Sequence, residues 1–454
     1  MNAGRPAPVD AHGRSTPGLL VGGAAEIVTM AGGVRRGSAQ GDAAVLAGPG
    51  LAVAAWEGRI EAVGAEDDVL ARLAADGLDW RDPALFRRVD ATGRTVTPGL
   101  IDAHTHLVFA GSREGEIDLR RRGLGYLEIL AAGGGILSTV ARTRAATREE
   151  LLSLGRRWLA EMLSHGTTTV EAKSGYGLTR EHELRQLEVA AALGAGGPVE
   201  VVPTFLGAHA VGPEYRGPGY ADRVAATEAY VRDVIEQQLP AVARQGIARF
   251  CDVFCEEGVF SADQSRRVLL AGARLGLVPR LHADELRPSG GAELAAELGA
   301  ASADHLGAPS AAGIDALARA AESGVPVVAT LLPGTSFYLK GEEYGPARAL
   351  IDRGVPLTLA SDFNPGTSPV ASLPLVCSIA VLRMGLTAAE ALAAVTVNAA
   401  HALRMGDTLG SLEPGRQADL VIWDVPAHEQ IPYWVGANLV RTVVKRGAVV
   451  LETV

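Results

Sequence analysis

The chain has little cysteine, with only Cys251, Cys255 and Cys377 among its 454 residues. Three thiols cannot build a disulfide framework. Cys251 and Cys255 would stand about 13 Å apart on one strand, too far for a disulfide bond. Sparse, unpaired cysteine is typical of reducing compartments, so we expect a cytoplasmic protein.

Positive charge is also scarce, with 42 Lys and Arg against 52 Asp and Glu and a net charge of −10. This balance argues against nucleic acid or an anionic membrane as a partner. One arginine in a cleft would still suit an anionic small substrate, because a local charge can outweigh the global field.

Long apolar runs are nearly absent. Residues 1–18 lack the apolar core of a signal peptide, and we interpret them as a disordered leader. The uncharged run 363–382 approaches membrane-spanning length, but Pro365, Pro369 and Pro374 interrupt it and argue against a spanning helix. We therefore expect no membrane partner.

The rest of the composition is that of an ordinary globular protein, with 48% hydrophobic and 21% charged residues. The length allows one large domain and a smaller one. Both ends of the chain show short apolar runs broken by glycine, which predict strands. These strands are expected at 25–30, 44–47, 51–56 and 58–64, and again at 418–424, 440–445 and 448–451, with a short helix at 67–75. We expect residues 19–97 and 405–454 to pair into one small β-sandwich domain.

Between these ends, residues 98–404 alternate apolar strand-like runs with helical patterns. The strands are expected at 98–107, 167–173, 199–207, 248–255, 278–282, 301–305, 325–332 and 356–362. Helices are expected at 148–165, 181–193, 221–238, 261–275, 290–298 and 311–323. Eight strands with intervening helices predict a (β/α)8 barrel. A doubly wound open sheet is the competing fold, but no Gly-x-Gly-x-x-Gly follows the first strand.

The first of these strands ends in His104 and His106, directly after Pro98-Gly99-Leu100-Ile101. Residues i and i+2 of a strand point to the same face, so the two imidazoles project together. Two surface histidines on an edge strand would be the simpler reading, but the apolar residues on both sides indicate a buried strand. An isolated His-x-His is a weak motif, and its meaning depends on further ligands elsewhere.

Other polar residues follow the remaining strands, and in a barrel those C-terminal strand ends surround the active site. These residues are His104, His106, Lys173, Tyr176, His209, Glu256, His282, Glu285, His305, Asp362 and Asn364. A single such histidine would more often be a capping or core residue. Five of the ten histidines of the chain lie in this set, which indicates a site.

A His-x-His after strand one, histidines after strands five and six and an aspartate after strand eight resemble the amidohydrolase superfamily. Within it, the chain is most similar to the imidazolonepropionase family, and the likeness extends over nearly the whole chain. The matching segments are 104–113, 133–136, 171–177, 204–209, 252–256, 303–306 and 361–367. The resemblance implies hydrolysis of the ring amide C–N bond of 4-imidazolone-5-propanoate to N-formimidoyl-L-glutamate, in histidine degradation, by a homodimer.

His104, His106, His282 and Asp362 would supply nitrogen and oxygen ligands for one divalent metal. Zinc and iron, as Fe²⁺ or Fe³⁺, both suit such ligands, so the choice stays open. Strand four ends in Cys255 and Glu256 without a lysine, so the carbamylated lysine of two-metal relatives has no source. We therefore expect one metal per chain, which lowers the pKa of its bound water towards about 7.

The resemblance also implies catalytic roles. Glu285 follows His282 by three residues, as the proton-shuttling glutamate of deaminase-like members does, and would act as general base and acid. A solvated carboxylate at a helix start is its simpler alternative. His305 would polarise the carbonyl or stabilise the oxyanion, and Asp362 would share in the catalytic centre.

For the substrate, the resemblance places Arg113 on the propanoate carboxylate, which a guanidinium pairs bidentately. Without the neighbouring motif, Arg113 would read as a surface arginine. Tyr176 and His209 match positions that hold the ring and the product. The formimidoyl-glutamate end would meet Asn364, Gly366 and Thr367.

Two rival functions use the same pattern. A guanine- or cytosine-type deaminase would share the metal ligands, but the segments around Arg113 and Tyr176 argue against it. A noncatalytic barrel used in assembly would typically lose metal ligands, whereas this chain keeps all four.

Overall fold

The computed structural model describes residues 17–123, 134–216, 219–322, 324, 326–339, 341 and 343–453. Residues 1–16 of the predicted leader lie outside the described residues, as does Gly133 of the matching segment 133–136. The first strand begins at Gly18, so the leader we predicted extends one residue too far.

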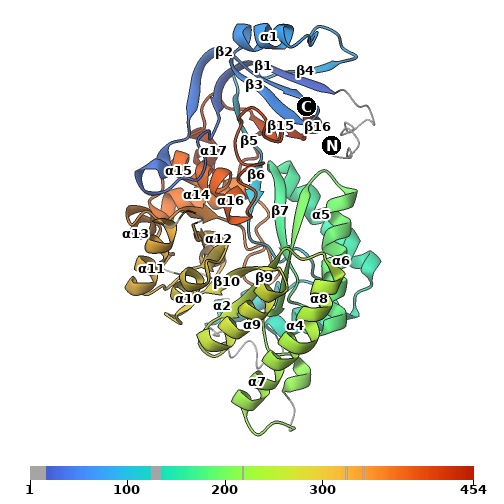
Figure 1. Ribbon diagram of the computed structural model, residues 1–454, viewed down its shortest axis with the longest axis vertical. Helices are drawn as coiled ribbons and strands as arrows, with labels where there is room; N and C mark the ends of the chain where they lie inside the picture. The colour runs from blue at the N-terminus through green and yellow to red at the C-terminus, as the bar shows by residue number, and fades with distance from the viewer. Residues whose placement is uncertain are drawn as a thin grey trace.

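Eight parallel strands form a barrel in the lower part of the molecule (Figure 1). The strands are β6 (Leu100–Asp102), β7 (Thr167–Lys173), β8 (Glu200–Ala208), β9 (Phe250–Cys255), β10 (Val278–Ala283), β11 (Ser302–His305), β12 (Val328–Leu331) and β13 (Leu357–Leu359). Each pairs with the next, and a bridge between Thr105 and Phe363 joins the segments that follow β6 and β13. Closure by this bridge confirms the predicted barrel and excludes an open sheet.

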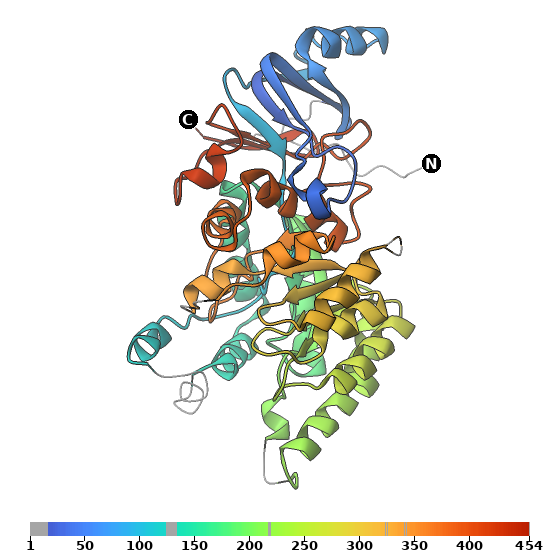
Figure 2. The same cartoon turned by 90° about the vertical axis from the view of Figure 1, so that its left-hand side faces the viewer.

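Helices surround the barrel and follow most of its strands, as Figure 2 shows. They are α2 (Gly115–Arg121), α4 (Ile136–Ala145), α5 (Arg148–Ser164), α6 (Arg180–Gly196), α7 (Arg223–Asp233), α8 (Leu239–Gln245), α9 (Ala262–Arg274), α10 (Gly291–Leu298), α11 (Ala311–Glu322), α12 (Pro333–Tyr338), α13 (Ala347–Asp352), α14 (Leu373–Met384), α15 (Ala388–Ala394) and α16 (Val397–Ala402). Several begin with the side-chain caps expected of Thr and Ser, among them the capping boxes Thr147–Glu150 and Ser261–Gln264.

Strands from both ends of the chain form a second, mixed sheet above the barrel (Figure 1). They are β1 (Gly18–Val28), β2 (Val45–Trp56), β3 (Arg59–Ala65), β4 (Phe86–Asp90), β5 (Thr95–Pro98), β14 (Leu420–Trp423), β15 (Val440–Lys445) and β16 (Ala448–Glu452). The order is β16-β15-β14-β5-β1-β2-β3, with β4 also paired to β1. One apolar cluster joins Val53 of β2 with Val449 of β16, so the sheet encloses a core of its own, as predicted for the two chain ends. The helices α1 (Glu66–Ala75) and α17 (Gln430–Tyr433) accompany this sheet.

Three local predictions were wrong. The runs 44–47 and 51–56 form the single strand β2, because Gly48 and Gly50 continue the strand at positive φ values of 138° and 74°. The helix predicted at 221–238 becomes a π-helix at Val234–Gln238, beside Pro240, which lacks the N–H that a regular α-helix would use. We also missed β4 and β5, which are too short to show a clear alternation.

The two sheets are connected by buried charges. Lys445, at the end of β15, lies 2.7 Å from the Asp419 carboxylate and 3.2 Å from that of Glu200, the first residue of barrel strand β8. Burial would raise the pKa of Glu200, but the nearby cations of Lys445 and Arg446 outweigh this effect and lower the pKa to about 2. No helix in the described part of the chain is both long and apolar enough to cross a membrane.

Candidate metal centre and active site

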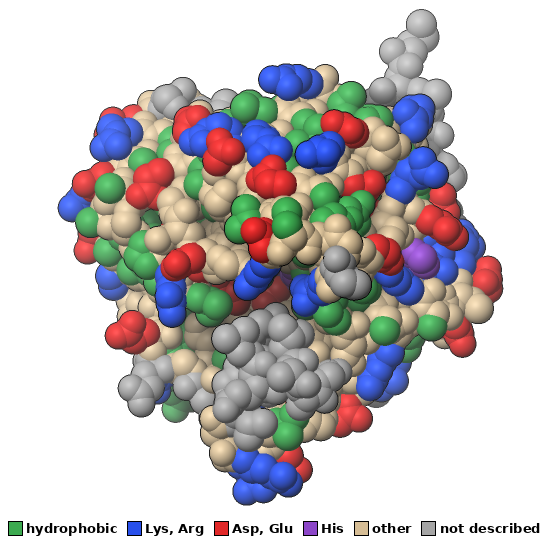
Figure 3. Space-filling view, turned by 90° about the horizontal axis from the view of Figure 1, so that it is seen from below, with side chains coloured by type: hydrophobic (Ala, Val, Ile, Leu, Met, Phe, Trp, Pro, Cys, Tyr) green, Lys and Arg blue, Asp and Glu red, His purple; other side chains and the backbone are tan. Residues whose placement is uncertain are grey.

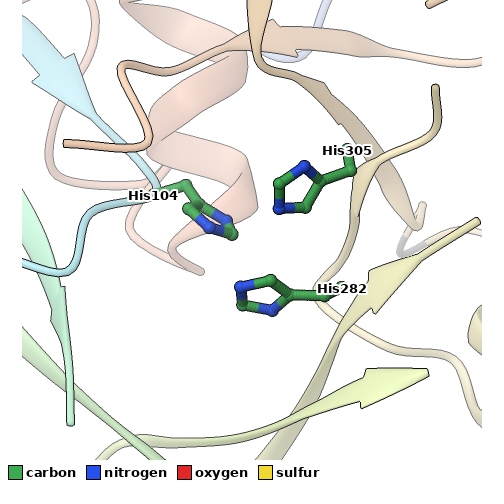
Figure 4. Close-up of side chains that lie close together, drawn as sticks. All are labelled: His104, His282 and His305. Carbon is green, nitrogen blue, oxygen red and sulfur yellow. The ribbon is translucent and has the colours of Figure 1, made fainter. Parts of the chain in front are cut away.

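Six residues at the ends of barrel strands bring ligand atoms together. Three overlapping groups each place their ligand atoms within 4.8 Å of one another: His104, His282 and His305; His106, His209 and His282; and His104, His106 and Asp362. Figure 4 shows the rings of the first group converging from three parts of the barrel wall. The four ligands predicted from the sequence therefore all belong to one buried cluster.

Unsatisfied polar atoms mark the centre of this cluster. Nε2 of His104 and Oδ1 of Asp362 are buried and lack a hydrogen-bond partner among the described residues. The same Oδ1 lies 3.5 Å from Nε2 of His104 and 3.4 Å from Nε2 of His106. Buried polar atoms without partners are rare and indicate a missing ion or water. Nitrogen and carboxylate donors are those that zinc and iron use, so the residues fit a divalent metal.

Two buried carboxylates orient the metal-facing histidines from behind. Nδ1 of His104 donates to Oδ2 of Asp304 at 2.7 Å. Nδ1 of His282 donates to Oδ1 of Asp252 at 3.1 Å, and the same oxygen accepts the backbone N–H of His282. Such carboxylate partners fix the ring orientation and leave Nε2 directed at a metal. The sequence contained the signal, since Asp252 and Asp304 interrupt otherwise apolar strands, but we did not assign them a role.

Beneath these carboxylates lies the fully buried Lys173, on β7. Its ammonium is 2.8 Å from Asp252, 2.9 Å from Glu171 and 3.7 Å from Asp304. Arg280 donates to Asp304 at 3.0 Å. These contacts hold the Lys173 ammonium inside the protein.

The electrostatic environment differs between neighbouring ligands. Burial and the Lys173 ammonium disfavour a charged His104 ring, but Asp304 and Asp362 outweigh them and raise its pKa to about 9. Burial lowers the pKa of His106 to about 4. His106 is therefore neutral at physiological pH and presents a lone pair to a metal.

Backbone strain is concentrated at the same strand ends. Asp284, His305 and Asp362 have φ values of 51°, 73° and 52°, in the left-handed region that residues with a side chain rarely adopt. Strain of this kind persists only where the surrounding structure enforces it, and it is frequent in active sites. It turns the His305 and Asp362 side chains into the cluster instead of along the strand.

Glu285 and His305 face each other at the edge of the cluster. Oε2 of Glu285 is 3.6 Å from Nδ1 of His305, and both line a cavity that also includes Thr335. Burial, reinforced by the carboxylates of Asp362 and Glu256, raises the pKa of Glu285 to about 8. Burial also holds the pKa of His305 well below its usual value. A carboxyl that titrates near neutral pH beside a neutral imidazole suits proton transfer.

Arg113 lies in the loop after β6 and is buried against Glu116. Nε and Nη2 of Arg113 donate to the two carboxylate oxygens at 2.8 and 2.9 Å, which leaves Nη1 outside the pair. A Cβ at Gly366 would overlap with Nη1. The absence of a side chain at Gly366 therefore allows the guanidinium to reach this position.

The rings of Tyr176 and His209 lie beside His106. The His209 ring stacks on the His106 ring with centroids 4.8 Å apart. The centroid of the Tyr176 ring is 5.4 Å from that of His209. The loop that carries Tyr176 is held by Glu183 of α6, whose carboxylate accepts the backbone N–H groups of Gly175, Gly177 and Leu178. Nδ1 of His209 donates to the carbonyl of Gly175, which directs Nε2 into the site.

Comparison with known proteins assigns the chain to a family. A model of the amidohydrolase family matches residues 95–450. An imidazolonepropionase of Geobacillus kaustophilus is 53% identical over 395 residues, covering 87% of this chain and 88% of the relative. An imidazolonepropionase of Symbiobacterium thermophilum is 50% identical over 435 residues, covering 96% and 97%. The chain belongs to the imidazolonepropionase group of the amidohydrolase family.

Solved structures extend the likeness of this amidohydrolase at the level of the fold. Guanine deaminase of E. coli superimposes with a TM-score of 0.67 at 14% identity, covering 96% of this chain and 99% of that chain. A zinc-bound adenosine deaminase of Xanthomonas campestris gives a TM-score of 0.62 at 20% identity, covering 99% and 94%. At such identities the comparison establishes only the shared barrel and accompanying sheet.

One residue that we predicted to meet the substrate forms hydrogen bonds within its own loop. The Asn364 amide is engaged within its own loop: Nδ2 donates to the carbonyl of Asp362 and to Thr367, and Oδ1 accepts the backbone N–H groups of Gly366 and Thr367. Asn364 thus shapes the loop after β13. The hydrogen bonds of Asn364 within this loop hold Gly366 and Thr367 beside Arg113.

The face of the amidohydrolase seen from below carries both signs of charge. Figure 3 shows Lys and Arg side chains interspersed with Asp and Glu, without a broad field of one sign. Nucleic-acid-binding proteins concentrate positive charge on one face. This view and the acidic composition both favour a small-molecule substrate.

Proposed function

We propose that this protein hydrolyses the ring amide C–N bond of 4-imidazolone-5-propanoate to give N-formimidoyl-L-glutamate. The observation that carries the proposal is the identity of 50–53% to imidazolonepropionases together with a complete buried His and Asp cluster. Water adds to the ring carbonyl carbon, which becomes a carboxylate, and the ring nitrogen released from it becomes the terminal nitrogen of the formimidoyl group.

In this proposal His104, His106, His282 and Asp362 hold one metal ion, Zn²⁺ or Fe²⁺/Fe³⁺. A metal at this position activates a water molecule and polarises the scissile carbonyl. His209 and His305 also lie within ligand distance of the cluster, but we assign them to the substrate. The ammonium of Lys173 is paired with carboxylates, so it cannot become the carbamate that bridges two metals.

The protein side chains then handle the proton and the developing charge. Glu285 removes a proton from the attacking water and delivers it to the leaving nitrogen, a transfer for which a raised pKa is suited. His305, neutral because of its burial, donates a hydrogen bond to the oxyanion. Asp362 keeps the attacking water oriented through its position between His104 and His106.

Arg113 receives the propanoate carboxylate, and its fixed orientation on Glu116 sets the distance between that carboxylate and the ring. Tyr176 and His209 hold the ring against the metal-binding histidines. The end of the molecule that becomes formimidoyl-glutamate meets Asn364, Gly366 and Thr367 in the loop after β13. This division gives the carboxylate, the ring and the scissile bond separate partners.

We further propose that the enzyme acts in the cytoplasm as a homodimer. All three cysteines are unpaired, which suits a reducing compartment. The dimer is supported by exposed apolar side chains at Tyr433, Trp434 and Val435, which are 69%, 51% and 56% accessible. Sedimentation of the purified protein measures this state directly.

The deciding experiment combines metal analysis of the purified protein with an assay for formimidoyl-glutamate. We expect one metal per chain and turnover of imidazolone propanoate that a chelator abolishes. Guanine, cytosine and adenosine serve as comparison substrates, because deaminases share the fold. Release of ammonia from one of them, with no turnover of imidazolone propanoate by metal-loaded protein, would instead identify a deaminase.

A further inference from the structure

Two of the three histidines assigned to the metal, His282 and His104, have carboxylate partners that both lie near the same lysine. Asp252 orients His282, and Asp304 orients His104. The ammonium of Lys173 lies 2.8 Å from Asp252 and 3.7 Å from Asp304, and all three side chains are fully buried. Lys173 is on β7, whereas the histidines follow β6 and lie on β10. One side chain therefore connects the supports of two candidate ligands on different strands.

Lys173 supplies one of the two cations that face three buried carboxylates in this group. Glu171, Asp252 and Asp304 are three buried carboxylates, and the only lysine and arginine that pair with them among the described residues are Lys173 and Arg280. Arg280 reaches only Asp304 of the three. Among the described residues, Lys173 is the only lysine or arginine that forms an ion pair with Asp252, and Arg280 acts on Asp252 only at longer range. Loss of this ammonium would therefore leave Asp252 beside two other buried carboxylates. Like charges repel strongly when they are buried.

The contacts of the Lys173 ammonium distinguish this residue from those that we assign to the substrate. Its ammonium is enclosed by Glu171, Asp252 and Asp304, and its side chain has no exposed area. It contacts the supports of His282 and His104 through Asp252 and Asp304, and its charge also acts on both rings at longer range. Its third partner, Glu171, accepts the backbone N–H of Thr105 between His104 and His106. A change at Lys173 can therefore alter the orientation of His282 and His104 without removing a ligand or a substrate contact.

We propose that Lys173 is a positioning residue of the metal centre, which holds Asp252 and Asp304 so that the rings of His282 and His104 face one ion. This inference rests on the proposed metal-dependent function. Loss of an outer partner of a metal ligand typically weakens metal binding 10- to 100-fold. Removal of the Lys173 charge should produce a loss of this size while all four ligands stay in the chain.

The test is the affinity of the full-length, metal-depleted protein for Zn²⁺, measured by competition with a chromophoric chelator. Lys173→Met is the main variant, and we expect its Kd for Zn²⁺ to rise 10- to 100-fold. The visible absorption of the Co²⁺-loaded protein is the second readout, because it reports ligand geometry. We expect the Lys173→Met spectrum to differ from that of the unchanged protein.

Lys445→Met is the matched control. Lys445 is likewise buried and paired with two carboxylates, those of Asp419 and Glu200, but it lies between the barrel and the second sheet. This variant should lower the melting temperature by removing a buried ion pair, and leave the Zn²⁺ affinity and the Co²⁺ spectrum unchanged. The comparison separates a specific effect on the metal centre from general destabilisation.

Lys173→Gln covers the case in which the methionine variant does not fold, because the amide keeps a donor for Asp252 without the charge. Its Kd should also rise at least tenfold.

A folded Lys173 variant with unchanged affinity and spectrum would refute the proposal, as would equal losses in the Lys173 and Lys445 variants. Failure of both Lys173 variants to fold, with Lys445→Met folded, would assign Lys173 a purely structural role. An unchanged protein that binds Zn²⁺ but does not hydrolyse imidazolone propanoate would refute the proposed reaction and leave this test intact.

Discussion

Glu116 binds the guanidinium of Arg113 through both of its carboxylate oxygens, at 2.8 and 2.9 Å, in the loop that follows the metal-facing histidines. Oε1 of Glu116 also accepts the backbone N–H of Gly135 at 2.7 Å, and Arg120 donates to its Oε2 at 3.0 Å. The arginine we assign to the substrate carboxylate is thus held rigidly before any substrate arrives. Preorganisation of this kind reduces the entropy lost on binding.

Arg113→Ala should mainly raise KM, because its contact with the carboxylate exists in both the ground state and the transition state. Hydrogen bonds to charged groups contribute about 1.5–3 kcal/mol, so we expect KM to rise about 10- to 100-fold with little change in kcat. Glu116→Gln should raise KM by a smaller factor, since the guanidinium stays but loses its fixed orientation. Arg121→Ala, on the exposed side of the same helix, is the control, and an unchanged KM in Arg113→Ala would place the propanoate elsewhere.

Glu285→Gln should lower kcat without loss of metal. The amide keeps the shape of the side chain but cannot carry a proton, and general acid–base catalysis typically contributes about 10²–10⁴-fold. His305→Gln should also lower kcat, and the double variant should lose less than the product of the two, because both residues act on one step. Steady-state kinetics and metal analysis of each variant test this, with the exposed Glu257→Gln as control. Near-full kcat in Glu285→Gln would transfer the shuttle to His305 or Asp362.

One metal ion per active chain is expected, and His282→Ala should abolish its retention. His282 contributes to two of the three ligand groups, and Asp252 holds its ring, so we expect the remaining ligands to bind the ion too weakly to retain it. Elemental analysis after gel filtration gives the ratio for both proteins. Two tightly bound ions per chain would contradict the single site, and full metal content in His282→Ala would remove strand β10 from it.

Glu200 should make stability depend on pH at the junction of the two sheets. Lys445 and Arg446 lower its pKa in the folded protein to about 2, whereas an unfolded glutamate titrates near 4.3. The resulting stabilisation is complete above the unfolded value and is lost as the pH falls towards 2. Glu200→Gln should therefore lower the free energy of unfolding by about 3 kcal/mol at neutral pH, with a smaller deficit at about pH 3. Urea unfolding of the metal-depleted protein at the two pH values measures both losses. The exposed Glu149→Gln is the control, and its free energy of unfolding should not approach that of the unchanged protein as the pH falls.

Much of the architecture was predictable because local sequence pattern determines local structure. The alternation of strand-like and helical segments between residues 98 and 404 predicted the barrel, and the glycine-broken runs at both ends predicted the accompanying sheet. The metal-facing residues followed from the barrel, because the C-terminal ends of its strands meet at one end. His104 and Asp362, 258 positions apart in the sequence, come within 3.5 Å for this reason alone.

The sequence by itself determined the eight barrel strands, their order and the side chains at their ends. Only the tertiary structure decided which charges meet. Lys173, Asp252 and Asp304 belong to three different strands, and their pairing depends on strand register and on the exclusion of water from the barrel, neither of which a local pattern encodes. The same holds for the engaged amide of Asn364 and for the pairing of Arg113 with Glu116. Local conformation follows from neighbours along the chain, whereas the partner of a buried charge is set by whichever oppositely charged group the closed fold places beside it.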